Sequence, residues 1–281
     1  MQPKPLNAKA ALASAVAAAQ AAGKLMRDNL NSPKRINVST QHDIKLELDV
    51  RCQKRIEQTL RKSFPDIPVL GEEGVLGDPE APTRWVVDPI DGTVNFTYGI
   101  PHACVSIALQ TRKPAPRRPG GAKGASRPHA PAASPYQTVV GVVYDPFCNE
   151  LWTALRGERA QLNGKPIRVS SHGKLKESIV SLGFAKSKAS LEKMLPVFNQ
   201  LVPRVRKIRI MGAAALALVY VASGRMDAYT EYNVRLWDIA AGGLILECAG
   251  GEFWHQAVAG EHTFSICANN GRLRRQLQRF G

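Results

Sequence analysis

The chain has 281 residues, of which 44% are hydrophobic, so it can bury a substantial core as one large domain or two smaller ones. No apolar run is long and unbroken enough for a membrane span, so we expect no membrane-spanning segment. Lysine and arginine outnumber aspartate and glutamate by 38 to 23, and the resulting charge of +15 favours anionic partners such as phosphorylated metabolites, nucleic acid or an acidic membrane surface.

The first predicted elements are two helices. The stretch NAKAALASAVAAAQAAGKL (residues 7–25) is alanine-rich and predicts a surface helix. It has no basic region ahead of a strongly apolar segment, and Gln20 interrupts it, so a signal peptide is disfavoured. A second helix is predicted over residues 49–64, where Cys52, Ile56 and Leu60 recur four apart on one face.

Short strands follow, and an unusual segment separates two of them. We predict strands at 69–74, 84–89, 102–111 and 138–146. Residues 112–136 hold six prolines, three glycines, six basic residues and no acidic residue. Such a composition cannot bury apolar surface. The segment is therefore predicted to be a flexible insertion that replaces a hairpin turn within a single domain spanning residues 1–281.

Helices and strands alternate in the second half of the chain. Strands are predicted on both sides of a turn at Asn163-Gly164, and helices over 190–202 and 212–224. The first of these helices is expected to place Leu191, Leu195, Phe198 and Val202 on one side. A strand at 178–184, a strand at 227–233 and a helix that starts near Asp238 complete a layered α/β arrangement with a mixed sheet.

The chain has five cysteines, an odd number, and no C-x-x-C pair. We expect reduced thiols in a cytoplasmic protein, each acting as a small buried apolar residue. The cysteines are Cys52, Cys104, Cys148, Cys248 and Cys267.

Two carboxylates follow a predicted buried strand in VVDPIDGT, residues 86–93. Asp88 and Asp91 would both point into the crevice at the strand end, where open α/β sheets place ligand groups. Close carboxylates repel one another unless they share a proton or a cation, and Mg²⁺ prefers such oxygen ligands. Pro89 fixes the chain between them, so the Ile90 carbonyl can also face a metal.

The next two residues suit a phosphate. Gly92 allows a phosphate to approach the backbone closely, and Thr93 stands at a predicted helix start, where free N–H groups favour an anion. Asp-Pro and Asp-Gly are also ordinary turn dipeptides, so this string alone does not decide the matter.

Two more acidic positions join the pattern. Glu72 and Glu73 directly follow a short apolar strand, and Asp238 follows Trp237 at a helix start. Taken singly, Glu73 is expected to be a solvated charge and Asp238 an N-cap.

Together, GEE, WVVDPIDGTVNF and WDIAA…AGG resemble the inositol monophosphatase family of magnesium-dependent, lithium-sensitive phosphatases. The similarity runs from the N-terminal helix to ANN near residue 268, apart from the insertion. It implies an αβαβα sandwich, commonly dimeric, whose substrate is a small phosphorylated metabolite and whose cofactor is Mg²⁺. No protein nucleophile is implied.

The resemblance also implies roles for individual residues. Glu72, Asp88 and the Ile90 carbonyl would hold a first Mg²⁺; Asp88, Asp91 and Asp238 would hold a second; and Glu72 would help to hold a weaker third. The amides of Gly92 and Thr93 would bind the phosphate, and Thr93, with Asp49 and Glu72, would activate water. Glu231 would accept a hydrogen bond from a substrate hydroxyl, and the substrate side would be lined by Gly212, Ala213 and Ala214. Asp91 is expected to act as a ligand alone, with no packing role.

One segment departs from the family pattern D-x-V-T-x-x-D. Here it reads DIKLELD, Asp43 to Asp49, with Leu46 in place of threonine and with Lys45 and Glu47 added. The last aspartate is kept, and the altered loop puts the affinity of the third ion in doubt.

Several alternatives remain open. Inositol monophosphate or a related polyol phosphate is the expected substrate, while 3′-phosphoadenosine 5′-phosphate, fructose bisphosphate and histidinol phosphate would suit the same metal core. A nucleic-acid-associated role for the basic insertion is an alternative from another class. We expect nucleic acid to be an unlikely partner, because the insertion has only one aromatic residue, Tyr136, for stacking on bases.

Overall fold

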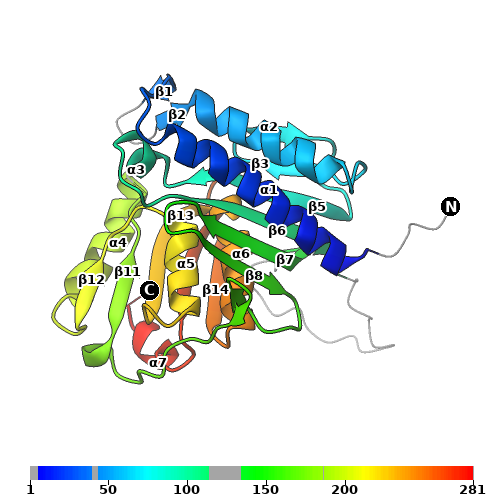
Figure 1. Ribbon diagram of the computed structural model, residues 1–281. Coiled ribbons are helices and arrows are strands. Elements are labelled where there is room, and N and C mark those ends of the chain that lie inside the picture. The colour runs from blue at the N-terminus through cyan, green and yellow to red at the C-terminus, as the bar shows by residue number, and fades with distance from the viewer. Residues whose placement is uncertain (1–5, 40–43, 114–133, 186, 281) are drawn as a thin grey trace, which may run out of the picture.

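The computed structural model describes residues 6–39, 44–113, 134–185 and 187–280. Within them, helices lie on the outer faces of two sheets and between the sheets (Figure 1). The helices are α1 (Ala8–Asn29), α2 (Glu47–Arg61), α3 (Thr93–Thr97), α4 (Lys188–Leu201), α5 (Ala214–Ala222), α6 (Leu236–Cys248), α7 (Arg274–Leu277) and a short 3₁₀ turn, η1 (Leu175–Glu177).

The larger sheet has the strand order β10-β9-β8-β7-β6-β5-β3-β4. It is mostly antiparallel, but its strands β3 and β5 run parallel, which brings their carboxyl ends to the same edge. The strands are β3 (Val69–Gly71), β4 (Gly74–Leu76), β5 (Thr83–Asp91), β6 (Cys104–Arg112), β7 (Tyr136–Asp145), β8 (Glu150–Leu155), β9 (Gln161–Leu162) and β10 (Lys165–Pro166).

The second sheet has the order β12-β11-β13-β15-β14. Strand β11 is parallel to both of its neighbours, and β15 is antiparallel to both of its own. The strands are β11 (Ile179–Leu182), β12 (Lys207–Arg209), β13 (Ala228–Arg235), β14 (Glu252–Ala257) and β15 (Thr263–Asn269), while β1 (Ile36–Ser39) and β2 (Ile44–Leu46) form a separate ribbon.

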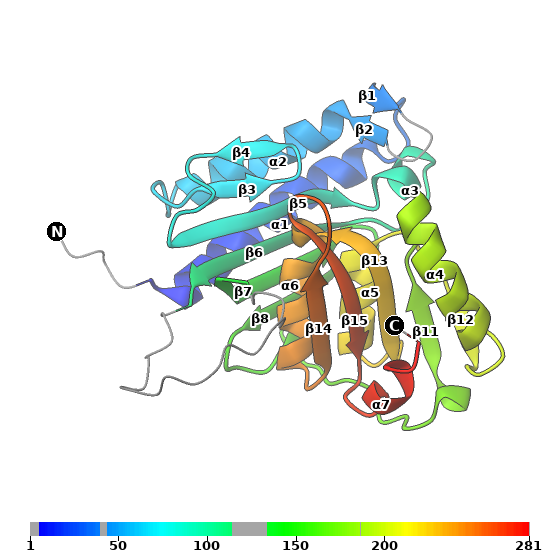
Figure 2. The same cartoon turned by 180° about the vertical axis from the view of Figure 1, so that it is seen from behind.

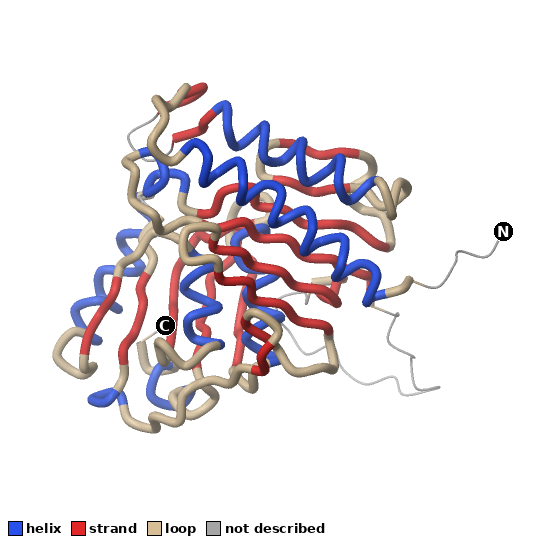
Figure 3. The backbone as a smooth tube through the Cα atoms, in the orientation of Figure 1, coloured by secondary structure: helices blue, strands red, loops and turns tan. Residues whose placement is uncertain are grey.

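The layers follow the order helix, sheet, helix, sheet, helix, which confirms the predicted αβαβα sandwich (Figures 2 and 3). Helices α1 and α2 cover the outer face of the larger sheet, and the buried face of α1 is built from alanines, which let the helix lie close to the strands. Helices α5 and α6 fill the space between the sheets, and α4 packs on the far face of the second.

A close helix–sheet approach positions the ends of α5 and α6. A Cβ on Gly141 of β7 would lie 2.8 Å from the carbonyl oxygen of Ala241 in α6, so only glycine permits this spacing. A Cβ on Gly242 would meet the Leu218 side chain of α5 at 2.8 Å. These close approaches hold α6 against β7 and α5 against α6.

The strands that flank the insertion are paired as expected. Strands β6 and β7 are antiparallel, and Arg112 lies opposite Tyr136. The expected flexible segment itself falls mainly on residues 114–133, which lie outside the described residues. No helix in the described part of the chain is long and apolar enough to cross a membrane.

Two expectations about buried side chains were wrong. In α4 the buried positions are Ser190, Met194 and Leu201, whereas Leu191 and Leu195 are 37% and 48% exposed. In this orientation the buried Ser190 hydroxyl donates to the Tyr232 carbonyl of β13 at 2.8 Å. Among the cysteines, Cys148 is exposed, because it lies in the turn between β7 and β8.

Candidate active site

Asp88 and Asp91 lie in the last four residues of β5. Their side chains are only 2% and 7% exposed. The pairing of β5 with β6 shifts register between them, and the Ile90 amide donates to the Asp88 carboxylate at 3.0 Å. Pro89 has no amide hydrogen to bond to β6, so β5 bulges at this point. The bulge allows the side chains of both aspartates to face the same side of the strand end.

Gly92 and Thr93 continue from the strand into α3. Gly92 has φ +92°, and a Cβ there would lie 2.9 Å from the His102 carbonyl oxygen and 3.2 Å from the Ala213 methyl. Glycine is therefore required for both conformation and space. The Thr93 hydroxyl donates to the Ile90 carbonyl at 2.9 Å.

Asn95 is a site residue that the sequence did not single out. Its side-chain amide donates to the carbonyls of His102 at 2.9 Å and Met211 at 2.8 Å. These bonds tie α3 to the segment that contains Gly212 and Ala213. The expected substrate-lining residues thus lie beside the Asp-Gly-Thr turn.

Asp91 has a structural contact that contradicts the expectation of a ligand with no packing role. Its two carboxylate oxygens accept hydrogen bonds from the amides of Ala214 and Ala215, at 3.1 and 2.8 Å. These amides open helix α5, whose N-terminal N–H groups need acceptors. Asp91 therefore joins the strand end to the first turn of α5.

Asp238 and Glu72 approach the same region from two other elements. Asp238 occupies the third position of α6, not the N-cap, and its carboxylate accepts from the Arg235 amide at 2.9 Å. Glu72 follows β3, where its amide donates to the Val87 carbonyl at 3.1 Å. The carboxyl groups of Glu72 and Asp88 lie within hydrogen-bonding reach of each other.

The four carboxyl groups perturb one another. Burial, followed by repulsion from its three acidic neighbours, raises the pKa of Asp88 well above its ordinary value. Burial, followed by repulsion from Asp91 and Glu72, raises the pKa of Asp238 well above its ordinary value, although the bond from the Arg235 amide acts in the opposite direction. Burial raises the pKa of Asp91 to about 6, although the α5 amides act in the opposite direction. A cluster of this kind favours any partner that supplies positive charge.

The donor set fits a hard divalent cation. It consists of carboxylate and carbonyl oxygens, which Mg²⁺ prefers, and it includes no thiolate or imidazole. Among the residues that the structure describes, no three acidic, cysteine or histidine side chains already converge tightly enough to hold an ion. The assignment of Glu72, Asp88, Ile90, Asp91 and Asp238 as ligands therefore stays a prediction.

Glu231 lies on β13 at the side of this cluster. Its carboxylate accepts a hydrogen bond from the buried Tyr229 hydroxyl. The carboxylate also fills the space above Gly183, where an added Cβ would lie 1.8 Å from Oε2. Burial raises the pKa of Glu231 to about 7, while the bond from Tyr229 lowers it.

Asp49 is 2% exposed and occupies the third position of α2. Its Oδ2 accepts from the Leu46 amide at 2.8 Å, so it caps the start of that helix. The Thr93 hydroxyl is directed at Ile90, and the expected relay between Thr93 and Asp49 stays a prediction.

The sequence profile of the inositol monophosphatase family matches residues 8–115 and 134–277. The chain belongs to this family. The match omits residues 116–133, so most of the proline-rich segment is an insertion relative to the family pattern.

Characterised relatives carry two kinds of name. The chain is 36% identical over 259 residues to Nus factor SuhB of Escherichia coli K12, covering 91% of this chain and 88% of the relative. It is also 36% identical over 250 residues to inositol monophosphatase 1 of Solanum lycopersicum, covering 85% and 82%. Because the bacterial relative is named as a Nus factor, the expectation that nucleic acid is an unlikely partner is not supported.

Solved structures show the same fold. The extragenic suppressor protein suhB from Bartonella henselae superposes with a TM-score of 0.82 at 30% identity, covering 96% of this chain and 97% of that one. Inositol monophosphatase from Anabaena (Nostoc) sp. PCC 7120 gives 0.79 at 29% identity, covering 98% and 96%. Family membership supports a phosphatase, and the family is generally metal-dependent.

Proposed function

We propose that this member of the inositol monophosphatase family is a Mg²⁺-dependent phosphomonoesterase that hydrolyses inositol monophosphate or a related polyol phosphate. The observation that carries the proposal is the gathering of Glu72, Asp88, Asp91 and Asp238 around the end of β5, where burial raises the pKa values of the three aspartates and repulsion between carboxylates raises those of Asp88 and Asp238 further. Divalent cations would relieve that repulsion.

Glu72, Asp88 and the Ile90 carbonyl would hold one Mg²⁺, and Asp88, Asp91 and Asp238 would hold another. When bound, Mg²⁺ polarises phosphoryl oxygens and lowers the pKa of coordinated water, which are the two effects that a slow phosphate monoester needs.

The remaining residues would orient the substrate. The amides of Gly92 and Thr93, at the start of α3, would bind the phosphate. Thr93, with Asp49 behind it and Glu72 beside it, would activate the attacking water. Glu231 would accept a hydrogen bond from a hydroxyl of the leaving group, which favours a polyol.

A substrate panel tests the proposal. Phosphate release would be measured at equal concentrations of inositol monophosphate, 3′-phosphoadenosine 5′-phosphate, fructose 1,6-bisphosphate and histidinol phosphate, with Mg²⁺ titrated. The proposal predicts the highest kcat/KM for inositol monophosphate. A clear preference for one of the other three would reassign the substrate, and no hydrolysis of any would refute the enzyme assignment.

We also propose a cytoplasmic homodimer, as the family resemblance implies. Sedimentation equilibrium would show twice the chain mass of 30.6 kDa if the dimer is correct.

A further inference from the structure

One end of the molecule, remote from the active site, concentrates basic side chains. Three chain segments, residues 168–178, 204–209 and 272–279, form what we call the basic end. They contain eleven basic residues and one acidic residue, Glu177. The basic residues are Arg168, Lys174, Lys176, Arg204, Arg206, Lys207, Arg209, Arg272, Arg274, Arg275 and Arg279.

Contacts fix the three segments into one surface. Gln276 joins the first and third segments: its side chain accepts from the Leu175 amide at 3.3 Å and donates to the Gly173 carbonyl at 2.9 Å. The Arg206 amide donates to the Ser178 carbonyl at 2.9 Å, at the border of the first and second segments. The second segment lies next to the end of the third, because the Arg204 guanidinium is 5.6 Å from the centre of the ring of Phe280, the residue that directly follows the third segment.

The positive charge of this surface is not neutralised from within. All eleven basic residues are exposed. Among the described residues, only Arg274 of this set has an ion pair, with Glu252 at 3.8 Å. Together with the six basic residues of 112–136, the basic end accounts for the whole net charge of +15, and the rest of the chain is close to neutral.

We propose that the basic end binds the phosphate backbone of a nucleic-acid duplex. Eight of its eleven basic residues are arginine, whose planar fork matches a phosphate with two parallel hydrogen bonds. The three segments contain no phenylalanine, tyrosine or tryptophan on which unpaired bases could stack, and their one imidazole, His172, is bonded to Asp227, so backbone contacts to a duplex suit this surface better than single-strand binding.

A lipid surface fits less well. Membrane docking by a basic surface is strengthened by apolar side chains that enter the lipid. Exposed large apolar residues near the basic end are Val202 and Ile210, which flank the second segment, and Trp254 of β14, which lines a cavity with Arg274. They lie on separate elements and do not form one continuous apolar face.

Except for Arg209, which ends β12 three residues before Gly212, the basic end lies at the opposite end of β13 from the active site. Asp227, just before β13, donates its amide to the Ile179 carbonyl and accepts from the Asn270 amide. Ile179 follows the first basic segment and Asn270 precedes the third, so β13 begins next to the basic end. It ends at Arg235, next to the start of α6. A strand of eight residues spans about 25 Å, so a duplex bound at one end leaves the other end accessible.

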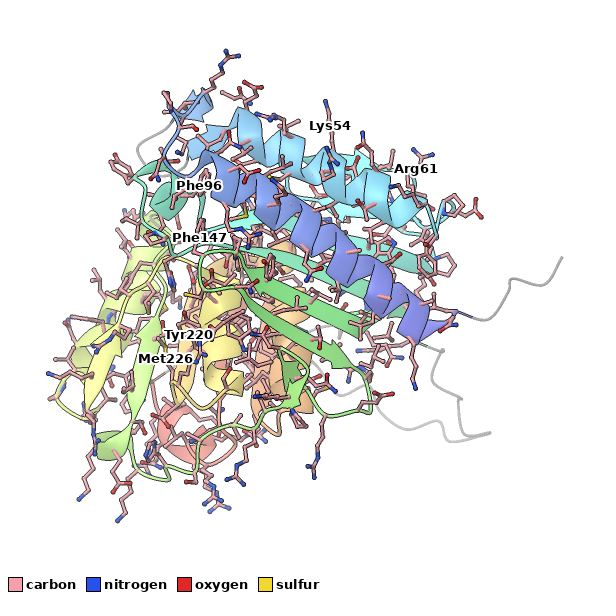
Figure 4. The ribbon with its side chains drawn as sticks, viewed as in Figure 1. Lys54, Arg61, Phe96, Phe147, Tyr220 and Met226 are labelled. Carbon is pink, nitrogen blue, oxygen red and sulfur yellow. The ribbon has the colours of Figure 1, made fainter. Side chains whose placement is uncertain are left out.

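The test is duplex binding by a charge-reversal variant and a matched control. The variant Lys174→Glu, Arg206→Glu, Arg275→Glu changes one exposed residue in each segment. The control Lys54→Glu, Arg61→Glu, Lys62→Glu makes the same charge change at exposed positions in and just after α2, on the opposite side of the molecule (Figure 4). Binding of a fluorescent 20-base-pair duplex would be followed by anisotropy from 50 to 300 mM KCl.

We expect the native protein to bind with an affinity that falls steeply with salt. The variant should bind at least tenfold more weakly at 50 mM KCl, and its salt slope should be smaller by about 0.9 for each lost phosphate contact. The control should keep the native slope. Equal losses in variant and control would overturn the proposal, as would binding to phosphatidylglycerol vesicles without binding to the duplex.

Discussion

The substitution Gly183→Ala tests whether the placement of Glu231 selects the substrate. The added Cβ would lie 1.8 Å from Oε2 and 2.2 Å from Cδ of Glu231, so the carboxylate must move away by about 1 Å or more. A shift of about 1 Å in a positioning group can cost roughly a hundredfold in rate. We therefore expect kcat/KM for inositol monophosphate to fall about a hundredfold.

The fold should tolerate this change. Gly183 does not have a positive φ, so alanine suits its backbone. The Tyr229 hydroxyl would lose its acceptor, which costs about 1 to 3 kcal/mol of unfolding free energy. Gly173→Ala is a matched control, because a Cβ there meets nothing within 4 Å.

The assay compares inositol monophosphate with 4-nitrophenyl phosphate, whose leaving group has no further hydroxyl for Glu231 to bind. The loss should be confined to the inositol substrate, and adding Glu231→Gln to Gly183→Ala should cause little further loss. Equal losses of kcat/KM on both substrates, or the same loss in Gly173→Ala, would show that the placement of Glu231 does not select the substrate.

Four further predictions follow from the same site. Asp91→Asn should abolish turnover and also lower the unfolding free energy by about 1.5 to 3 kcal/mol, because the asparagine side chain has one oxygen and can accept from only one of the Ala214 and Ala215 backbone N–H groups. Denaturant unfolding in EDTA would measure this loss, and unchanged stability would contradict it. Without divalent cations, the melting temperature should fall as pH rises from about 5 to about 7. The raised pKa values of Asp91 and Glu231 mean that the folded state binds more protons than the unfolded state in this range. Added Mg²⁺ should remove most of the fall, and a melting temperature that rises with pH in EDTA would contradict the prediction. Deletion of residues 114–133, with Lys113 joined to Ser134 by a short turn, should leave kcat on small substrates nearly unchanged in phosphate-release assays, whereas a large loss would place that segment over the site. Lithium should inhibit uncompetitively, as the family resemblance implies, and steady-state kinetics with saturating Mg²⁺ should give parallel double-reciprocal lines; no inhibition at roughly tens of millimolar would contradict this.

The sequence predicted the layered fold and the positions that meet at the end of β5, because these depend on local signals. Apolar runs mark the buried strands, and Asp, Gly and Thr at their ends mark the turn. The bond between Asp91 and the first turn of α5 joins residues more than 120 positions apart, and no local pattern reports it. The contact of Gly183 with Glu231 has the same origin, since Gly183 directly follows β11, which runs parallel to β13, the strand of Glu231.

Other misses had a signal or a clear physical cause. Tyr229 and Glu231 are two residues apart on one strand and thus share a face, so the pair could have been predicted. In α4 the apolar spacing placed Leu191 and Leu195 on one side, but the helix buries Ser190, Met194 and Leu201. The Ser190 hydroxyl bonds to the Tyr232 carbonyl on β13, a contact between distant segments that no local spacing reports.

Whether this chain is a Mg²⁺-dependent phosphatase is tested most directly by measuring phosphate release from inositol monophosphate as Mg²⁺ is added back to EDTA-treated protein. Circular dichroism at each step would show that the chain stays folded. We expect no turnover in EDTA, a saturable rise in the rate of phosphate release with Mg²⁺, and no such rise in the variant Asp238→Asn. Turnover that persists in EDTA, or a folded native protein that releases no phosphate at any Mg²⁺ concentration, would contradict it.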